Sequence, residues 1–313
     1  MAVAGARLAS LLGLSFAAVV PAKTGGAVLA RIEREGGRWQ AAVQPPAAGG
    51  AVAGGGAAGG GRAGAAVGGG HFLDHFAEAE RAVAAAGVPT VADEIFGQLS
   101  HEPEWIVVGA GTGAMSAAIG RHLRRHGRRT RLAVVDPENS AYFPARASVA
   151  GDYGTGKPSR IPGIGQPRVE PGFQPGVVDL AMPVPDVASV AALWWLRDEA
   201  GVWRGSRQDR RRAPTCGVCH LVARMREEGA KGSIVTIIGD GAEPYRNTHH
   251  DAEWARARGL DPTRHAAVIE RFVRTGGSGG RPRSWVGPGA SPSGRRTCPV
   301  RSRGPRRVPH RPR

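Results

Sequence analysis

Three glycines at positions 109, 111 and 113 follow directly on an apolar run from Trp105 to Val108. Glycine lets the backbone approach a ligand closely, and a helix that begins behind such a turn presents unpaired N–H groups and a partial positive charge. The stretch from Gly109 to Ala114 therefore predicts an anion site, with a phosphate group as the expected ligand. The same pattern also occurs as a tight turn that binds nothing, so spacing alone leaves both interpretations open.

The glycines lie inside a predicted βαβ unit. Apolar residues at helical spacing predict a helix from Ala114 to His126, and Gly127 is a helix-stop signal. A second buried strand is predicted from Leu132 to Val135, with Asp136 at its end. Because strand, helix and strand alternate, we expect an α/β fold with a parallel sheet flanked by helices.

Asp136 gives the glycine turn a second possible ligand. Gly109 to Ala114 matches the dinucleotide pattern G-x-G-x-x-G/A, and an acidic residue at the end of the next strand is where a ribose would bind. A nucleotide-dependent oxidoreductase that uses these residues is therefore an alternative function.

A cysteine motif and a histidine motif each have a simpler explanation than a haem or metal site. Cys216 to His220 matches the C-x-x-C-H pattern of c-type haem attachment. The motif lies in an arginine-rich stretch without a recognisable secondary-structure pattern, so a chance match is favoured. His249, His250 and Asp251 are adjacent, and adjacent residues on a helix point in different directions. We interpret them as the start of a surface helix, and no metal site is predicted.

Composition narrows the class of protein. The chain has 313 residues, 41% of them hydrophobic, which is enough for a core. Its net charge of +16 invites a nucleic-acid partner, but residues 281–313 hold ten arginines and no acidic residue, so most of the charge belongs to the tail. A protein that binds nucleic acid through this tail is a further alternative. Three cysteines form no disulfide framework and no apolar run is long enough for a membrane span, so a cytoplasmic protein is expected.

The N-terminal region has two interpretations. Residues 1–23 resemble a weak signal peptide, but a short helix to Leu12 followed by a buried strand from Ser15 to Val20 is favoured, because the charged region is thin and the cleavage site poor. Residues 41–70 are almost wholly Gly, Ala, Val and Pro without a period, which predicts disorder. Further helices are predicted at 26–36, 91–99, 186–199, 221–228 and 250–258, and further strands at 177–184 and 233–238.

Several collinear segments resemble one known family. In chain order they are LLGLSFAAVVPAKT, ARIEREGGRWQ, HFLDHFAEAERA, IVVGAGTGAMSAAIGRHLR, VVDPENSAYF, PSRIPGIGQPRVEPGF, VVDLAMPVPDVASVAALWWL and GSIVTIIGDGAEPYRNTHHDAEWARARGLD. They are similar to the pyridoxal-phosphate-dependent cysteine synthase and cystathionine β-synthase family, and most of all to its cysteine desulfhydrase branch. The resemblance implies fold type II, pyridoxal 5'-phosphate as cofactor, a homodimer, and β-elimination or β-replacement on a small amino acid such as cysteine or an activated serine.

The resemblance also implies site residues. The positions that would hold the cofactor phosphate are Gly111, Thr112, Gly113, Ala114 and Met115. Two of these depart from the family, which has Gly and Thr in place of the last two residues. The positions in a loop beside the substrate are Gly163, Ile164 and Gly165. Ser206 falls where the family places a serine against the pyridine nitrogen of the cofactor.

The reactive lysine of the family has no counterpart in the matched segments. It precedes the first matched segment in the family, whereas Lys23, Lys157 and Lys231 lie in segments that align elsewhere. Without it the principal base for proton abstraction at Cα is missing, so no catalytic residue is assigned. We expect an N-terminally truncated chain with impaired or no activity.

The unmatched stretches at 41–70, 207–216 and 276–313 are rich in Gly, Ala, Pro and Arg. Out-of-frame translation of GC-rich DNA gives the same composition. We therefore hypothesise local frame errors or a decayed gene.

The expected domain organisation follows from these segments. Residues 1–85 would be the remnant of a small N-terminal domain with the insert at 41–70, residues 86–265 a large phosphate-binding domain, and residues 266–313 a disordered tail.

Overall fold

The computed structural model describes residues 1–21, 24–41, 70–84, 89–148, 154–155, 159–198, 214–237 and 245–276. Ser206, Lys23, Lys157, Cys298 and most of the 41–70 insert lie outside these ranges. The helices are α1 (Ala2–Leu11), α2 (Gly26–Arg34), α4 (His75–Ala84), α5 (Val91–Gln98), α6 (Ala114–Arg125), α7 (Tyr142–Ser148), the 3-10 helix η1 (Pro175–Val177), α8 (Asp186–Asp198), α9 (Pro214–Glu227), α10 (Ala252–Arg256) and α11 (Thr263–Thr275). The strands are β1 (Ala17–Val20), β2 (Arg38–Ala41), β3 (Trp105–Gly109), β4 (Arg131–Pro137), β5 (Leu180–Val184) and β6 (Ile234–Thr236).

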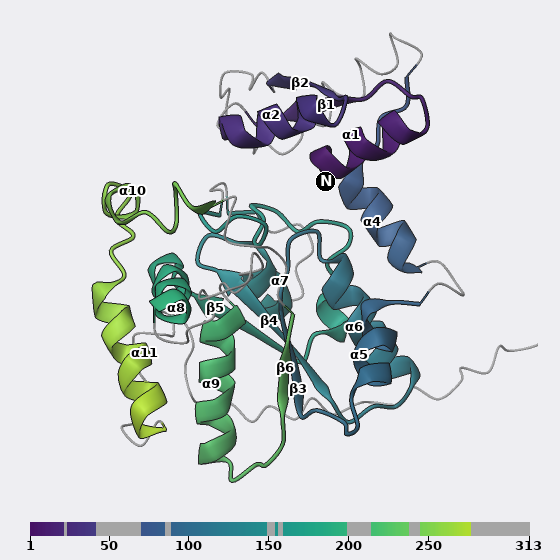
Figure 1. Cartoon of the computed structure of the whole chain (residues 1–313). Coiled ribbons are helices and arrows are strands. Elements are labelled where there is room, and N and C mark those ends of the chain that lie inside the picture. The colour runs from purple at the N-terminus through teal and green to yellow at the C-terminus, as the bar shows by residue number, and fades with distance from the viewer. Residues whose placement is uncertain are drawn as a thin grey trace, which may run out of the picture.

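A four-stranded parallel sheet forms the centre of the larger part of the molecule (Figure 1), with the strand order β5-β4-β3-β6. The predicted βαβ unit is confirmed: β3, α6 and β4 occupy the expected segments, and Ile106 pairs with Leu132. Because all carboxyl ends of a parallel sheet meet at one edge, the glycine turn after β3 lies at that edge. The expectation of an α/β fold with a parallel sheet is confirmed.

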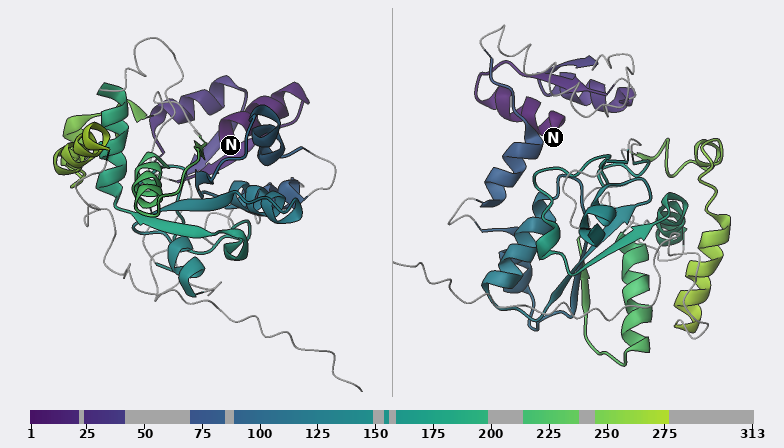
Figure 2. Two further views of the ribbon diagram at one scale, coloured as in Figure 1. Left: turned by 90° about the horizontal axis from the view of Figure 1, so that it is seen from below. Right: turned by 180° about the vertical axis from the view of Figure 1, so that it is seen from behind.

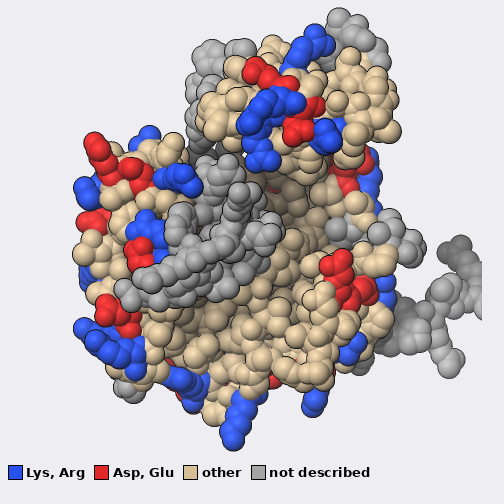
Figure 3. Space-filling view, in the orientation of Figure 1, with Lys and Arg blue, Asp and Glu red and all other residues tan. Residues whose placement is uncertain are grey.

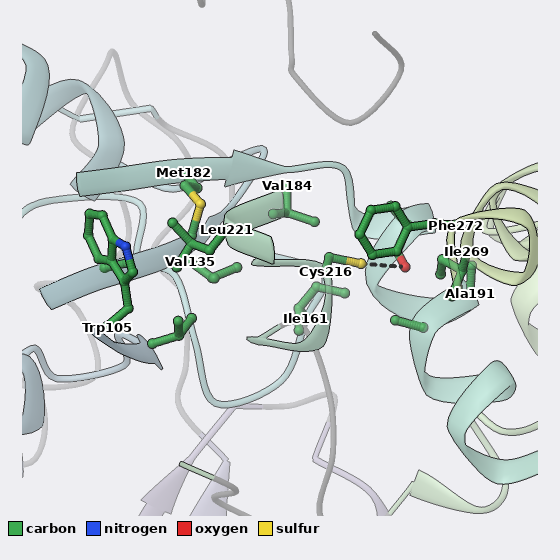
Figure 4. Close-up of a cluster of buried hydrophobic side chains, with 14 of the residues drawn as sticks. Trp105, Val135, Ile161, Met182, Val184, Ala191, Cys216, Leu221, Ile269 and Phe272 are labelled. Atoms are coloured by element: carbon green, nitrogen blue, oxygen red, sulfur yellow. Dashed lines mark hydrogen bonds between the residues drawn. The ribbon is translucent and has the colours of Figure 1, made fainter. Parts of the chain in front are cut away.

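Both faces of this sheet are covered by helices. Val107 and Val135 point to one face, where they form a core with residues of α8, α9 and α11 (Figure 4). Ile106 and Val134 point to the other face and pack with residues of α5, α6 and α7. Successive side chains of a strand point to opposite faces, so the continuous apolar runs of β3 and β4 are explained by burial on both sides.

A smaller unit at the N-terminus lies on the carboxyl-edge side of the large sheet (Figures 1 and 2). Strands β1 and β2 pair in parallel, and α1 and α2 share a small core with them that includes Ala6, Ala18, Val20 and Ile32. The favoured interpretation of the first 20 residues, a helix and then a strand, is confirmed. The strand is buried on alternate residues, however, and not throughout as predicted.

Two predictions for the C-terminal half are wrong. Helix α9 begins at Pro214 and not at Leu221, because Gly217 has no side chain and lets the first turns of the helix lie directly against Val135 of β4. Residues 266–275, assigned to a disordered tail, belong to α11, which buries Ile269 and Phe272 against the large core. Residues 277–313 lie outside the described ranges.

Other elements differ from the predictions mainly in length. Strand β5 begins at Leu180, since residues 175–177 form η1, and β6 covers only Ile234–Thr236. Strand β6 is half-buried because it pairs only with β3 at the edge of the sheet. None of the helices in the described ranges has the length and apolar character of a membrane span.

Candidate functional site

The glycine turn, residues Gly109 to Gly113, connects the carboxyl end of β3 to the first residue of α6. Gly113 is the N-cap of α6 and has a φ of +83°, a left-handed conformation that residues with a Cβ atom rarely adopt. The first amides of a helix have no partner within it, and the first turn of α6 contains no acidic residue. This turn therefore has the features of an anion-binding helix start.

The predicted substrate loop, Gly163 to Gly165, lies directly on the glycine turn. The N–H of Gly165 donates to the carbonyl oxygen of Ala110 over 2.7 Å. A Cβ atom on Gly109 would lie 2.7 Å from Cγ2 of Ile164, and one on Gly111 would clash with the carbonyl oxygen of Gly163. The structure thus brings together two segments that the sequence predicted separately, while their roles toward a ligand stay a prediction.

A second part of the same loop closes over the helix start. Gly172 lies so near the turn that an added Cβ atom would be 2.5 Å from the carbonyl oxygen of Thr112. A Cβ atom on Gly113 would clash with the backbone of Phe173. These glycines are therefore required for close packing of backbone on backbone as well as for approach to a ligand.

Tyr142 contacts both the glycine turn and the loop segment that contains Phe173. Its side chain is fully buried, and its hydroxyl donates to the carbonyl oxygen of Gly111 over 2.7 Å. Its ring stacks on Phe173 with 4.2 Å between the ring centroids. Burial, reinforced by the nearby Glu170 and Asp136 carboxyl groups, raises the pKa of Tyr142 well above its usual range, so the hydroxyl remains a donor.

The side chains of the turn stabilise the start of α6. Thr112 Oγ1 accepts a hydrogen bond from the N–H of Ala114 over 3.2 Å, and Ser116 Oγ donates to the carbonyl oxygen of Gly113 over 2.8 Å. Met115, which stands where the related family has a threonine, is 40% exposed, whereas Ala114 is buried. Met115 is therefore in contact with solvent beside the helix start.

Asp136 is not placed to bind a ribose. Its side chain is fully buried, and its Oδ2 accepts a hydrogen bond from the N–H of Phe143 over 2.5 Å. Burial raises its pKa to about 7, although hydrogen bonds from Ser140 and Phe143 favour the ionised form. The carboxyl group thus supports the chain reversal after β4, and the interpretation of Asp136 as a nucleotide ligand is wrong.

Arg160 ties the substrate loop to the rest of the domain. Its Nε donates to Asp186 Oδ2 over 2.8 Å and its Nη2 to Glu138 Oε1 over 2.6 Å. Its carbonyl oxygen lies 2.9 Å from His249 Nε2. Burial raises the pKa of Asp186, whereas the ion pair with Arg160 acts in the opposite direction and lowers it. The loop is therefore anchored to α8 and to the segment before α10 just ahead of its contact with the glycine turn.

The cysteine and histidine motifs have structural explanations. Cys216 and Cys219 lie in helix α9, and Cys216 is buried with its thiol donating to the carbonyl oxygen of Ala188 over 3.2 Å (Figure 4). Burial raises the pKa of both thiols, to about 11 for Cys219, so neither is a ready thiolate. Asp251 caps α10 by accepting from the N–H of Trp254 over 2.6 Å. Within the described ranges, no group of three metal-ligating side chains comes together.

Lys231 lies at the wrong edge of the sheet to reach the glycine turn. It is exposed and sits in the connection between α9 and β6 (Figure 1), next to Gly232, whose Cα faces Glu104 just before β3. Trp105, at the start of β3, pairs with Ile234, so Lys231 marks the amino-terminal edge. The length of β3 separates the two edges by roughly 15 Å at about 3.3 Å per residue.

One face of the described part has a surface charge that favours no nucleic-acid site. On the face shown in Figure 3, basic and acidic side chains are interspersed. The arginine-rich tail that carries the nucleic-acid alternative lies outside the described residues.

Sequence reasoning missed three residues that shape the turn: Tyr142, Arg160 and Phe173. Tyr142 and Phe173 lie in segments whose resemblance was noted, AYF and EPGF, but a resemblance of segments assigns no contact. A buried aromatic hydroxyl must find a partner, which is the signal that could have pointed to Tyr142.

Most of the chain is similar to known proteins. Residues 1–240 match the family described as pyridoxal-phosphate dependent enzyme. The chain is 43% identical over 283 residues to L-cysteine desulfhydrase of Mycobacterium tuberculosis, covering 88% of this chain and 72% of that protein. It is 27% identical over 184 residues to cysteine synthase 1 of Emericella nidulans, covering 56% of this chain and 46% of that protein. The crystal structure of O-ureido-L-serine synthase superimposes with a TM-score of 0.59 at 20% identity, covering 79% of this chain and 72% of that one, and shows the likeness of fold.

The chain therefore belongs to the pyridoxal-phosphate-dependent enzyme family, and its α/β architecture is that of the fold type II members. The family implies pyridoxal phosphate as the cofactor. The glycine turn fits the phosphate group of this cofactor, because it offers the first-turn amides of α6 without a competing acidic side chain. Among the described residues, no lysine lies at this edge of the sheet to meet the aldehyde group.

Proposed function

We propose that this protein provides a pyridoxal-phosphate site for β-elimination or β-replacement on a small amino acid such as cysteine or an activated serine. The observation that supports this most is the clamped glycine turn at the carboxyl edge of the sheet, in a chain 43% identical to a protein named as an L-cysteine desulfhydrase. When bound, the cofactor supplies an electron sink for the carbanion formed at Cα of the amino acid.

The residues of this chain would hold and orient the cofactor through its phosphate. Apart from the Ala114 N–H, which donates to Thr112 Oγ1, the backbone amides from Gly111 to Met115 would donate to the phosphate oxygens, with the positive end of α6 behind them. The loop at Gly163 to Gly165 covers the turn, and it would exclude water on that side and border the substrate. The family's threonine hydroxyl is replaced at Met115, so one phosphate hydrogen bond would be lost while the backbone donors remain.

We further propose that this chain does not attach the cofactor covalently and is inactive or impaired by itself. Lys231 lies at the opposite edge of the sheet, farther from the glycine turn than a lysine side chain reaches. Lys23 and Lys157 lie outside the described residues, in segments that do not align with the reactive lysine. A homodimer and a cytoplasmic location remain part of this proposal on family grounds.

Cofactor binding and covalent attachment can be tested separately. The full chain would be titrated with pyridoxal phosphate, treated with borohydride, digested and mapped by mass spectrometry, while sulfide release from cysteine is measured in parallel. We expect saturable binding that gel filtration reverses, no lysine adduct, and no sulfide release above a cofactor-only blank. Lys231→Arg is the matched control and should leave binding unchanged.

Each contrary result has a distinct meaning. A stoichiometric adduct at one of the three lysines would contradict the proposed lack of covalent attachment, and sulfide release with an ordinary enzymatic turnover of about 1 per second or faster would contradict the proposed impairment. Failure to bind pyridoxal phosphate at all would contradict the phosphate site itself.

A further inference from the structure

The hydroxyl of Tyr142 is a fixed part of the glycine turn. The hydroxyl donates to the Gly111 carbonyl oxygen over 2.7 Å. The ring has its own support, because it lies at the start of α7 in the core that α5 and α6 form with the sheet, and it stacks on Phe173. The side chain thus has two separable parts, a packed ring and a hydroxyl directed at the turn.

Planarity of the peptide bond connects this hydrogen bond to the ligand side of the turn. The carbonyl of Gly111 and the N–H of Thr112 belong to one trans peptide group and point in opposite directions. Holding the carbonyl therefore also fixes the direction of the Thr112 amide, away from Tyr142. The preceding peptide is held in the same way, because the N–H of Gly165 donates to the carbonyl oxygen of Ala110.

We propose that Tyr142 is a positioning residue for the phosphate-binding turn, whose hydroxyl holds the Gly111 carbonyl so that the Thr112 amide is oriented for a phosphate oxygen. This inference rests on the proposed function, since it assumes that the ligand of the turn is the cofactor phosphate. Tyr142 itself touches no ligand and acts through the peptide group. Phenylalanine at this position would keep the ring packing and release the peptide.

The test compares two variants that each lose one buried hydroxyl. Tyr142→Phe removes the hydrogen bond to Gly111, and Thr130→Val removes the 2.7 Å hydrogen bond from buried Thr130 to the Pro103 carbonyl at the other edge of the sheet. Binding of pyridoxal phosphate and of pyridoxal, which lacks the phosphate, would be measured by calorimetry. We expect Tyr142→Phe to weaken pyridoxal phosphate binding about 5- to 10-fold, as the loss of one buried hydrogen bond implies. Pyridoxal binding should change less than about twofold, and Thr130→Val should change neither.

A role confined to packing would weaken both ligands equally or neither, and either result would overturn the proposal. Hydrogen–deuterium exchange of the ligand-free proteins is a second test of whether Tyr142 holds the turn in place. The amides from Thr112 to Ser116 should exchange about 5- to 10-fold faster in Tyr142→Phe, while those of β4 keep their rates. If the wild type binds no pyridoxal phosphate, the proposed function fails, and an unchanged exchange rate in the turn would separately rule out the positioning role.

Discussion

The two parallel sheets of this chain are covered very differently. Strands β3 and β4 are buried on both faces by helices that belong to the same domain. Strands β1 and β2 share one small core with α1 and α2, whereas Val19 and Trp39 on these strands are each 38% exposed. Large apolar side chains of the small unit that remain at least 60% exposed are Met1, Leu8, Leu11, Leu12 and Leu14.

Parallel strands are normally buried on both faces, so the contrast has a consequence for stability. The large domain supplies its own cover, and the glycine turn depends on that domain. The small unit packs chiefly on itself among the described residues and leaves much apolar surface in solvent. We therefore expect the proposed phosphate site to tolerate changes in the small unit and to be sensitive to changes beneath the turn.

The largest difference in the free energy of unfolding is expected between alanine substitutions at two glycines with positive φ, one in each region. Gly113→Ala places a Cβ atom against the backbone of Phe173 at a φ of +83°, and backbone cannot move aside as a flexible side chain can. Strain and overpacking together should lower the free energy of unfolding by more than about 3 kcal/mol. Gly13→Ala has a φ of +67° with nothing within 4 Å of the new atom, so a loss of about 1 kcal/mol is expected. Urea unfolding of both variants measures the difference, and equal losses would contradict the contrast.

A smaller effect, which depends on pH, is expected at Asp136. Burial raises its pKa to about 7, so between about pH 4 and pH 7 the folded protein keeps a proton that the unfolded chain releases. The contribution of this group to stability therefore falls as the pH rises through that window. Asp136→Asn cannot ionise, so its stability lacks this pH dependence. Its free energy of unfolding relative to that of the wild type should therefore be higher at pH 8 than at pH 4, on the order of a few kcal/mol.

The measurement is the free energy of unfolding of both proteins across this pH range. Thr24→Val serves as the control in the small unit, because it removes a hydroxyl that does not titrate in this range and donates a 2.7 Å hydrogen bond to the Pro21 carbonyl oxygen. It should show no comparable slope. A constant difference between Asp136→Asn and the wild type at all pH values would show that the buried carboxyl is already ionised in the fold.

The smallest effect is expected on the exposed apolar surface of the small unit. Leu12 is 71% exposed, so Leu12→Gln should change the free energy of unfolding by less than about 0.5 kcal/mol. Leu123→Gln places the same amide at a fully buried position in the large domain and should cost several times more. A loss above about 1 kcal/mol for Leu12→Gln in denaturant titration would mean that this face is covered in solution.

Prediction from sequence succeeded where the signals were local. The strand from Trp105, the glycines and the amphipathic helix from Ala114 are neighbours in the chain, and all three elements formed as expected. It failed for α9, where the Pro-Thr-Cys-Gly start has no helical period and is stabilised by contact of Gly217 with β4. It also ended the domain too early, because the reason for α11 to fold is the surface of α8, which is distant in sequence.

The sequence by itself determined the glycine turn, the parallel α/β class and the resemblance to pyridoxal-phosphate enzymes, because each of these is written in contiguous segments. The tertiary structure alone decided which groups meet the turn. It placed Gly163 and Phe173 on the glycines, the Tyr142 hydroxyl on the Gly111 carbonyl, and Lys231 at the far edge of the sheet. The physical reason is the parallel arrangement of the strands: residues that follow a strand gather at one edge and residues that precede one gather at the other, whatever their distance along the chain.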